Sequence, residues 1–365
     1  MHFRSPPQLI GYSFSLDAVN ECRRHNGLLS LRIETSRLCN LRCIYCNSSS
    51  GNTLNNEISF VLIKDVILQA SSMGAKSIVV IGGGEPTIYP QFRQLINYIN
   101  ALGMVPVVVT NGMTLSIELA SFLNSTNCSV LLKYDSLDKG TQDFFADKPG
   151  AYEKIREAIA VLEGVGMNTI TNEGQLRVGL SFVTTTLNIL ESIDIWKYCR
   201  SNNFYPNQEF IVPNGRARDH LDLIPSQADI FKNKKDLLDF DRKQYGYNWL
   251  VYKPLTAIGC LQFLYSLYID ILGYIRPCAA IQNNLIHISK FSLQEAINHP
   301  FISYVRNIDK HLSGKCLSCQ FNFECYGCRG NAYTIGKLQG LDDYEAISSD
   351  DPFCMKPEST DSLEY

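Results

Sequence analysis

Three cysteines stand close together near the start of the 365-residue chain, at Cys39, Cys43 and Cys46. Soft thiolates with this spacing on one short segment are suited to an iron–sulfur cluster. A structural zinc ion takes a fourth protein ligand nearby, whereas the next cysteine along the chain is Cys128. Three thiolates on a four-iron cluster leave one iron free. The spacing therefore predicts a cluster that can bind another molecule at its open iron.

Of the 13 cysteines, seven more lie in the last third of the chain. They are Cys260, Cys278, Cys316, Cys319, Cys325, Cys328 and Cys354. Zinc ribbons and iron–sulfur clusters both use thiolates in such numbers, and the cysteines alone leave both interpretations open. Two four-iron clusters need eight ligands, so one iron would be open or would take a different side chain. Cys22, Cys128 and Cys199 are scattered, and we expect them to be small buried hydrophobes.

The composition excludes several classes of protein. Hydrophobic residues make up 45% of the chain, enough to bury a large core. The formal net charge of -3 offers no overall attraction to nucleic acid or to an acidic membrane. No apolar run reaches the roughly 18 residues of a membrane helix, and the N-terminus lacks the apolar core of a signal peptide. We therefore expect a cytoplasmic protein with no nucleic-acid and no membrane partner, whose cysteines bind metal.

Six short apolar and β-branched segments are predicted as strands, each followed by an amphipathic helix. The strands are expected at residues 31–36, 76–83, 105–110, 129–135, 176–184 and 208–213. The helices are expected at residues 60–73, 89–102, 116–124, 151–164, 189–202 and 226–240. This alternation predicts an α/β fold with a parallel sheet. Six units are fewer than the eight of a closed barrel, so we expect a partial (βα)6 TIM-like barrel.

The predicted sheet brings the unusual residues together, because ligands gather at the carboxyl ends of parallel strands. The cysteine trio follows the first strand, residues 82–86 follow the second, residues 110–112 follow the third, and residues 133–138 surround the end of the fourth. The domain organisation then comprises five segments. These are an N-terminal extension (1–30), the barrel (31–240), a linker (241–257), a small Cys-rich domain (258–357) and a tail (358–365).

The segment ETSRLCNLRCIYCNSSSG, followed by GGGEPT, resembles the radical S-adenosylmethionine (SAM) superfamily over about residues 31–213. The resemblance implies that Cys39, Cys43 and Cys46 hold a 4Fe-4S cluster whose fourth iron is chelated by the amino and carboxylate groups of SAM. One electron would cleave SAM to methionine and a 5′-deoxyadenosyl radical, which would take a hydrogen atom from a substrate. An electron donor such as flavodoxin or ferredoxin is the partner that this chemistry implies.

The same resemblance assigns a SAM-binding set. Tyr45 would lie beside the adenine, and Gly83 and Gly84 would let backbone carbonyls approach the methionyl ammonium, with Glu85 as its counter-charge. A plain strand-to-helix turn is the alternative for these glycines. The full expected set is Tyr45, Gly83, Gly84, Glu85, Pro86, Asn111, Lys133, Asp135, Thr184 and Asn188.

Two lysines depart from the family pattern. Many relatives carry a serine and an aspartate at the fourth strand and an arginine further on, before a glycine. Here Lys133 precedes Asp135 in the first place, and Lys148 precedes Gly150 in the second. We expect the Lys133 ammonium to meet the SAM carboxylate as a point charge. The alternative is a strand-edge lysine that reaches solvent.

The roles of Asn188, residues 215–217 and Glu209 are left open by the sequence. Asn188 and residues 215–217 fall where relatives contact SAM or close the barrel, but ordinary loop roles explain them equally well. Glu209 is an acid in a predicted apolar strand, so it would bind substrate, take a proton or simply be solvated. The catalytic set is predicted as Cys39, Cys43, Cys46 and Glu209.

The C-terminal segments KCLSCQFNFECYGCRGNAY and DDPFC resemble the SPASM extension found on many radical SAM enzymes. The resemblance implies two auxiliary 4Fe-4S clusters. The first would use Cys260, Cys278 and Cys328, and the second Cys316, Cys319, Cys325 and Cys354. Sulfatase maturases carry an acid directly after the cysteine that matches Cys278, whereas this chain has Ala279. Sulfatase maturation is therefore not expected.

The function predicted is that of a radical SAM oxidoreductase or maturase whose auxiliary clusters oxidise the substrate radical. Most SPASM relatives modify peptides or proteins, which favours a peptide or protein side chain as substrate. The 30 residues before the first strand are too few for a separate peptide-recognition domain, so a small molecule such as a sugar, aminocyclitol or tetrapyrrole is the alternative. A scattered cysteine that donates a hydrogen atom would make the enzyme an epimerase. A non-enzymatic zinc or iron–sulfur protein is the remote alternative.

Overall fold

The computed structural model describes residues 5–247, 261–319, 325–352 and 354. Its centre is an eight-stranded sheet in the order β6-β5-β4-β3-β2-β1-β7-β8. The strands are β1 (Ser30–Ile33), β2 (Ser77–Val80), β3 (Val105–Thr110), β4 (Ser129–Lys133), β5 (Val178–Thr184), β6 (Tyr205–Phe210), β7 (Ser266–Ile269) and β8 (Ile275–Arg276). All pairings are parallel except that of β7 with β8. The α/β fold with a partial parallel barrel is confirmed.

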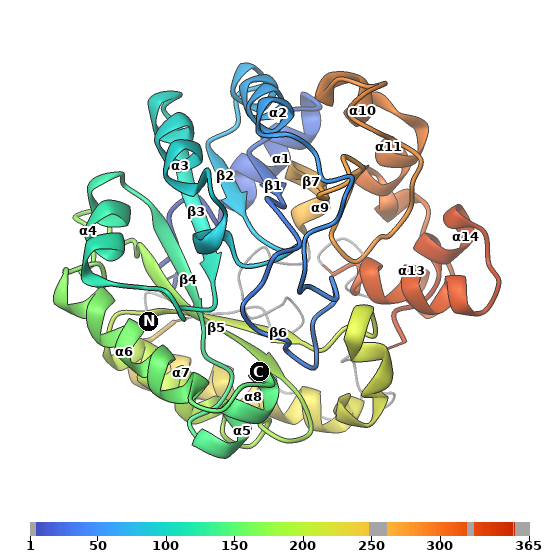
Figure 1. Ribbon diagram of the computed structural model, residues 1–365. Coiled ribbons are helices and arrows are strands. Elements are labelled where there is room, and N and C mark those ends of the chain that lie inside the picture. Colours follow the sequence, from blue (N-terminus) through green and yellow to red (C-terminus); the bar gives the residue numbers. More distant parts are fainter. Residues whose placement is uncertain (1–4, 248–260, 320–324, 353, 355–365) are drawn as a thin grey trace.

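Helices α2, α3, α4, α6 and α7 lie along the outside of the sheet, and α10, α11, α13 and α14 gather beyond β7 (Figure 1). In chain order the helices are α1 (Leu16–Arg24), α2 (Phe60–Ser72), α3 (Phe92–Ala101), α4 (Ile117–Ser125), α5 (Lys139–Ala146), α6 (Ala151–Gly164), α7 (Ser192–Ser201), α8 (Gln227–Tyr245), α9 (Gln262–Tyr265), α10 (Leu293–Asn298), α11 (Pro300–Arg306), α12 (Gly314–Leu317), α13 (Arg329–Leu338) and α14 (Asp343–Ser348). No helix in the described ranges has both the length and the apolar character to cross a membrane.

Local sequence explains where the outer helices begin and how they pack. Ser59 and Ser116 cap α2 and α4 by accepting a backbone N–H with the side-chain oxygen. The apolar faces of these helices and the outward residues of the strands form two large buried clusters. Every residue of β2 and β5 is buried, as expected for parallel strands covered on both faces.

The sixth strand differs most from the sequence expectation. Residues 208–213 were expected, but β6 runs from Tyr205 to Phe210 and includes Pro206. Proline lacks an N–H, which argues against a central strand, but β6 is an edge of the sheet and tolerates it. Helix α8 likewise extends to Tyr245, five residues past its expected end, and stops where Gly246 adopts a left-handed conformation. The expected linker therefore begins inside α8, and its second half lies outside the described residues.

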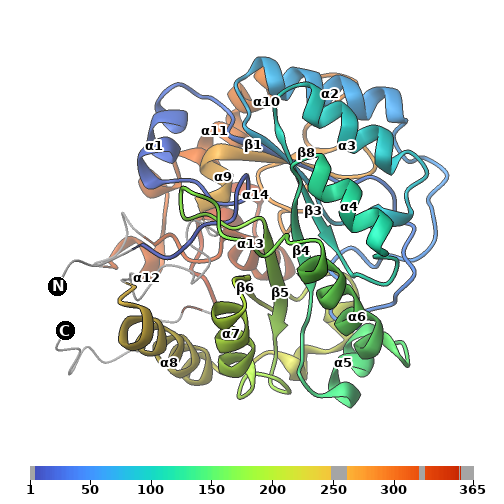
Figure 2. The same ribbon diagram turned by 90° about the vertical axis from the view of Figure 1, so that its left-hand side faces the viewer.

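The N-terminal segment closes the barrel at the amino ends of the strands. Ile10 donates its N–H to Leu176 O (3.0 Å) and accepts the Ser129 hydroxyl at its carbonyl (2.8 Å). Tyr12 packs edge-on against Tyr205, with ring centroids 6.4 Å apart. Within the expected extension, the segment around Ile10 and Tyr12 covers the amino ends of the strands, and α1 packs on α9 (Figure 2).

The C-terminal region shares the barrel sheet. Strand β7 pairs with β1 from Ser30 opposite Ser266 to Ile33 opposite Ile269. Helix α10 also contacts α2. The boundary expected at residue 258 therefore separates two segments that fold against each other around one sheet.

Candidate active site

The cysteine loop follows β1 and is held mainly by backbone hydrogen bonds. Cys39 donates its N–H to Gly51 O (2.9 Å), and Cys46 donates to Cys43 O (3.1 Å). Ser50 donates its N–H to Cys46 Sγ (3.4 Å). These contacts fix the three thiols on one compact loop at the carboxyl end of the sheet.

Arg216 clamps this loop from the segment that follows β6. Its Nε donates to Cys43 O and its Nη1 to Ser50 O, both at 2.8 Å, and its backbone N–H donates to Cys46 O (3.0 Å). The preceding Gly215 has φ +57°, and a Cβ there would lie 2.3 Å from Cys46 O. Glycine is therefore needed at this contact. Sequence analysis named residues 215–217 without seeing that Arg216 binds the cysteine loop.

The three thiols suit a cluster better than a single ion. All are free and half-buried. Burial raises the pKa of Cys39, and it raises that of Cys43 to about 12, with Asp135 and the two neighbouring cysteines adding to the effect. Iron ions would supply the positive charge that stabilises thiolates here. Within the described residues, no three His, Cys, Asp or Glu side chains converge as the ligands of one ion would, whereas a cluster offers each thiolate its own iron.

The glycine-rich turn after β2 lies directly against the cysteine loop. Glu85 donates its N–H to Leu38 O (2.8 Å), and a Cβ on Gly84 would lie 1.9 Å from the same oxygen. A Cβ on Gly83 would lie 2.6 Å from Ser36 O. These glycines are therefore required for close approach of two backbones, which a plain strand-to-helix turn does not explain. Pro86 then begins a single 3-10 turn with Glu85 as its N-cap.

Glu85 has a structural role that sequence analysis did not foresee. Its Oε1 accepts the Thr87 N–H (3.1 Å) and the hydroxyls of Thr87 and Thr110 (both 2.6 Å), while Oε2 accepts the Asn111 N–H (2.8 Å). Burial raises the pKa of this carboxyl, against the effect of these hydrogen bonds. Because Oε2 has one partner, it keeps room for one more donor. Asn111 in turn donates to Asn40 Oδ1 (2.7 Å) on the cysteine loop.

Tyr45, Lys133 and Asp135 form one cluster beside Cys43. Tyr45 donates its hydroxyl to Asp135 Oδ2, and the Lys133 ammonium lies 3.4 Å from Asp135 Oδ1 and 5.3 Å from the centre of the Tyr45 ring. Burial lowers the pKa of Lys133, but Asp135 and Glu209 outweigh it, so the net pKa is raised. The lysine is thus a half-buried cation beside Asp135, not a strand-edge residue extended into solvent.

Asn188 and Thr184 support this cluster through hydrogen bonds within the protein. The Asn188 carboxamide donates to Asp135 O (2.7 Å) and Val183 O (2.8 Å), and it accepts the N–H and hydroxyl of Thr185. Thr184 is fully buried and accepts from Gln208 Nε2 (3.0 Å). Both side chains are thus engaged by the protein, and their contact with SAM stays a prediction. Asn188 positions Asp135.

Glu209 is exposed on the inner side of β6. Asn207 Nδ2 bridges it to β5, donating to Glu209 Oε1 (3.3 Å) and to Ser181 Oγ (3.0 Å). The Glu209 charge helps to raise the pKa values of Lys133 and Tyr12, two residues of the barrel interior. The carboxylate therefore faces that interior. It is therefore accessible to a substrate but is not held next to the cysteine loop.

Sequence analysis missed a buried pair beneath the glycine-rich turn. The Tyr268 hydroxyl donates to Glu34 Oε1 (2.5 Å), and Ile271 donates its N–H to Glu34 Oε2 (3.0 Å). Arg37 on the cysteine loop lies 3.6 Å from the same carboxylate, and a Cβ on Gly82 would lie 2.5 Å from the Tyr268 hydroxyl. The sequence offered one clue, because Glu34 is an acid in a predicted apolar strand. Its partner Tyr268 lies outside the predicted α/β repeat, so the pair could not be predicted.

The C-terminal cysteines form two neighbourhoods. Burial, Asp351 and Cys278 together raise the pKa of Cys328 to about 12, so these two thiols are neighbours. Burial and Cys354 raise the pKa of Cys325 in the same way. Arg329 Nη2 donates to Cys316 Sγ (3.5 Å). Cys260 lies outside the described residues.

One side chain joins the barrel to this region. Asn214 is 1% exposed, and its Nδ2 donates to Thr334 Oγ1 on α13 (3.2 Å) and to Ala280 O (3.4 Å), two residues after Cys278. Asn214 and Arg216 therefore tie the two cysteine regions to one short segment.

Comparison with known proteins agrees with this geometry. The model of the Radical SAM superfamily matches residues 33–174. The AdoMet-dependent heme synthase of Methanosarcina barkeri is 23% identical over 348 residues, covering 87% of this chain and 93% of its own length. The mycofactocin maturase MftC of Mycolicibacterium smegmatis is 25% identical over 353 residues, covering 92% and 85%.

The fold has a solved counterpart as well. The crystal structure of Streptococcus suis SuiB bound to S-adenosylmethionine superimposes with a TM-score of 0.67 at 18% identity, over 92% of this chain and 80% of SuiB. The match to the Radical SAM superfamily supports SAM and a 4Fe-4S cluster as the cofactors. Residues 33–174 therefore match the Radical SAM superfamily, within a chain whose fold resembles that of SuiB.

Proposed function

We propose that this enzyme oxidises a peptide or protein side chain, removing one hydrogen atom through SAM and one electron through an auxiliary cluster. The observation that carries the proposal is the link of Asn214 and Arg216 between the two cysteine regions. A substrate in the barrel mouth would then have the SAM centre on one side and an auxiliary centre on the other. A proton leaves with the second electron, so the product lacks two hydrogen atoms.

Each site residue has a role in this proposal. Cys39, Cys43 and Cys46 would hold the cluster, which when bound supplies the electron that cleaves SAM to methionine and a 5′-deoxyadenosyl radical. Lys133 would bind the SAM carboxylate, and the turn at residues 83–85 would receive its ammonium. The adenine would lie beside Tyr45. Glu209 would bind substrate or accept its proton, because it is the exposed acid on the inner side of β6.

The expected grouping of the C-terminal cysteines is supported by their neighbours. Cys278 helps to raise the pKa of Cys328, and Cys354 helps to raise that of Cys325. We assign the first pair, with Cys260, to one auxiliary cluster. We assign the second pair, with Cys316 and Cys319, to the other.

Two related proteins favour a peptide substrate. A second structure of SuiB holds its precursor peptide SuiA, with a TM-score of 0.67 to this chain. MftC is named a maturase. The alternative is a small molecule such as a tetrapyrrole, which the match to an AdoMet-dependent heme synthase favours.

The test uses reconstituted enzyme under anaerobic, reducing conditions. We expect 5′-deoxyadenosine from SAM in the wild type and none in Cys43→Ala, with about 12 irons per chain. A short peptide encoded beside the gene should lose two hydrogen atoms by mass spectrometry. Zinc in the C-terminal region would contradict the oxidative role, and a modified tetrapyrrole or sugar with an unchanged peptide would favour the alternative.

A further inference from the structure

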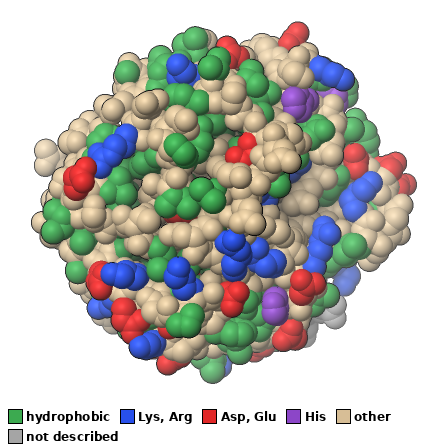
Figure 3. Space-filling view, in the orientation of Figure 1, with side chains coloured by type: hydrophobic (Ala, Val, Ile, Leu, Met, Phe, Trp, Pro, Cys, Tyr) green, Lys and Arg blue, Asp and Glu red, His purple; other side chains and the backbone are tan. Residues whose placement is uncertain are grey.

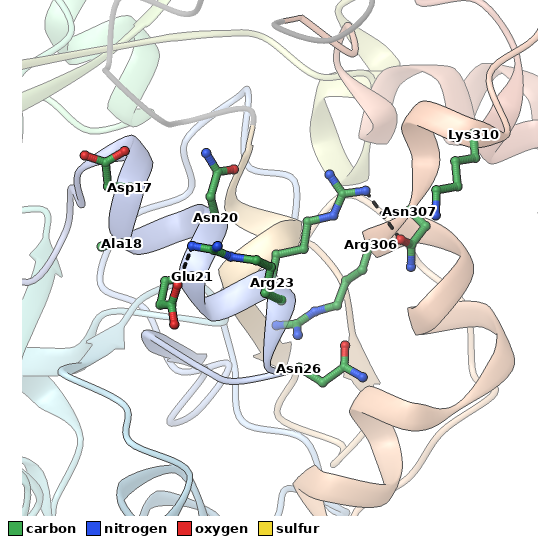
Figure 4. Close-up of a pocket in the computed structure, with 10 residues that line it drawn as sticks. Asp17, Ala18, Asn20, Glu21, Arg23, Asn26, Arg306, Asn307 and Lys310 are labelled. Atoms are coloured by element: carbon green, nitrogen blue, oxygen red, sulfur yellow. Dashed lines mark hydrogen bonds and ion pairs between the residues drawn. The ribbon is translucent and has the colours of Figure 1, made fainter.

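A polar pocket lies between α1 and α11, at the amino ends of the strands and away from the cysteine loop. Its volume is about 1100 Å³. It is lined by Asp17, Ala18, Asn20, Glu21, Arg23, Arg24, Asn26, Arg306, Asn307 and Lys310. Figure 4 shows the two acids on the α1 side and Arg306 and Lys310 on the α11 side. The α11 side therefore carries two positive charges, whereas α1 contributes two acids and two arginines.

Among the described residues, two of the pocket's four cations have no counter-ion. Arg23 is paired with Asp309, and Arg24 is paired with Glu21. Neither Arg306 nor Lys310 has a carboxylate within salt-bridge distance among the residues that the structure describes.

Arg306 is the unusual member. It is only 2% exposed, and its Nη2 donates to Gly27 O (3.0 Å), but within the described ranges Nε and Nη1 have no partner. Burial lowers its pKa to about 10, which still leaves it charged at neutral pH. A buried cation with two free donors and no counter-ion is costly to a protein. Its guanidinium reaches from α11 toward α1, beside Arg23 (Figure 4).

We propose that this pocket binds an oxyanion, a carboxylate or phosphate group, against the guanidinium of Arg306. Planar guanidinium donors match both groups in a fork. Lys310, exposed at the end of the pocket, adds a second positive charge. The carboxamides of Asn20, Asn26 and Asn307 offer further donors to whatever carries the oxyanion. The source is either an acidic peptide or free phosphate.

The test measures binding of two probes, inorganic phosphate and a tetraglutamate peptide, to the reconstituted holoenzyme by calorimetry. We expect Arg306→Met to weaken binding at least about 10-fold, and Lys310→Met to weaken it several-fold. Lys154→Met, an exposed lysine on α6, is the matched control and should bind like the wild type.

The two probes separate the sources. Saturable binding of tetraglutamate alone identifies an acidic peptide, and competition by phosphate identifies a free oxyanion. Because Arg306→Met also removes the bond to Gly27, Lys310→Met provides the surface variant that cannot disturb the core. Failure of both probes to bind, or equal binding by wild type and both variants, would overturn the proposal.

Discussion

At the scale of single residues, Lys133 is a cation of the candidate site. The half-buried lysine lies between Asp135 and the Tyr45 ring, so one carboxylate already balances its charge. Asp135 in turn accepts the Val183 N–H (2.8 Å) and the Tyr45 hydroxyl. Asp135 therefore keeps two donors if the lysine is removed, and the cluster need not collapse. Figure 3 shows Lys and Arg side chains next to one another near the centre of the face seen in Figure 1.

The Lys133→Met variant tests this role. Loss of a charge-assisted hydrogen bond costs about 1.5 to 3 kcal/mol, so the Kd for SAM should rise roughly 10- to 100-fold. Equilibrium binding of SAM to the reconstituted enzyme measures the effect, and Lys133→Arg should restore part of it. Lys154→Met serves as the control. Unchanged SAM affinity in Lys133→Met would show that the lysine only balances Asp135.

At the scale of elements, the sequence predicted the strands and helices whose apolar residues recur with a regular local period. Strand 105–110 and helix 151–164 have the expected bounds, because their apolar periodicity and flanking turns agree. Helices α1 and α5 were missed. Tyr268 could not have been predicted as part of the site, since its contact with Glu34 joins residues 234 positions apart through the β1–β7 pairing. The sequence also could not show that the Asn188 carboxamide hydrogen-bonds Asp135 O and Val183 O.

The β1–β7 joint predicts a pH effect on stability. Burial raises the pKa of Glu34 above its ordinary 4.5, although Arg37 and the bonds from Tyr268 and Ile271 oppose this. The unfolded chain therefore loses this proton at lower pH than the folded protein does. The stability contributed by Glu34 is full below about pH 4.5 and falls as the pH rises toward the raised pKa.

The Glu34→Gln variant isolates the pH-dependent stability that the ionisation of Glu34 contributes. Glutamine keeps an acceptor for Ile271 and a partner for Tyr268, but it does not ionise. The difference in Tm between Glu34→Gln and wild type should therefore become more positive from about pH 5 to 8. Glu118→Gln, at an exposed position on α4, is the control and should show no such trend. A difference that stays constant with pH would contradict the raised pKa.

At the scale of the whole molecule, residues 214–216 couple two regions that are distant in sequence. Arg216 holds the loop of Cys43 and Cys46, while Asn214 holds α13 and the segment after Cys278. The order of the cysteines predicted both regions, but not that one loop after β6 holds them together. That loop is positioned by β6, the strand whose bounds differed most from expectation.

Because each side chain binds a different region, loss of Asn214 and loss of Arg216 should loosen different parts of the molecule. In Asn214→Ala, loss of buried hydrogen bonds worth about 1 kcal/mol should speed amide hydrogen exchange several-fold in α13 and after Cys278, while the loop at 43–50 stays protected. In Arg216→Gln, exchange should rise at 43–50 instead, and 5′-deoxyadenosine formation should fall with it. Asn168→Ala, which removes a bond to Asn202 O on the outer side of the barrel, is the control. If both variants loosen both regions equally, the segment is a general structural element, and the two cysteine regions are not held independently.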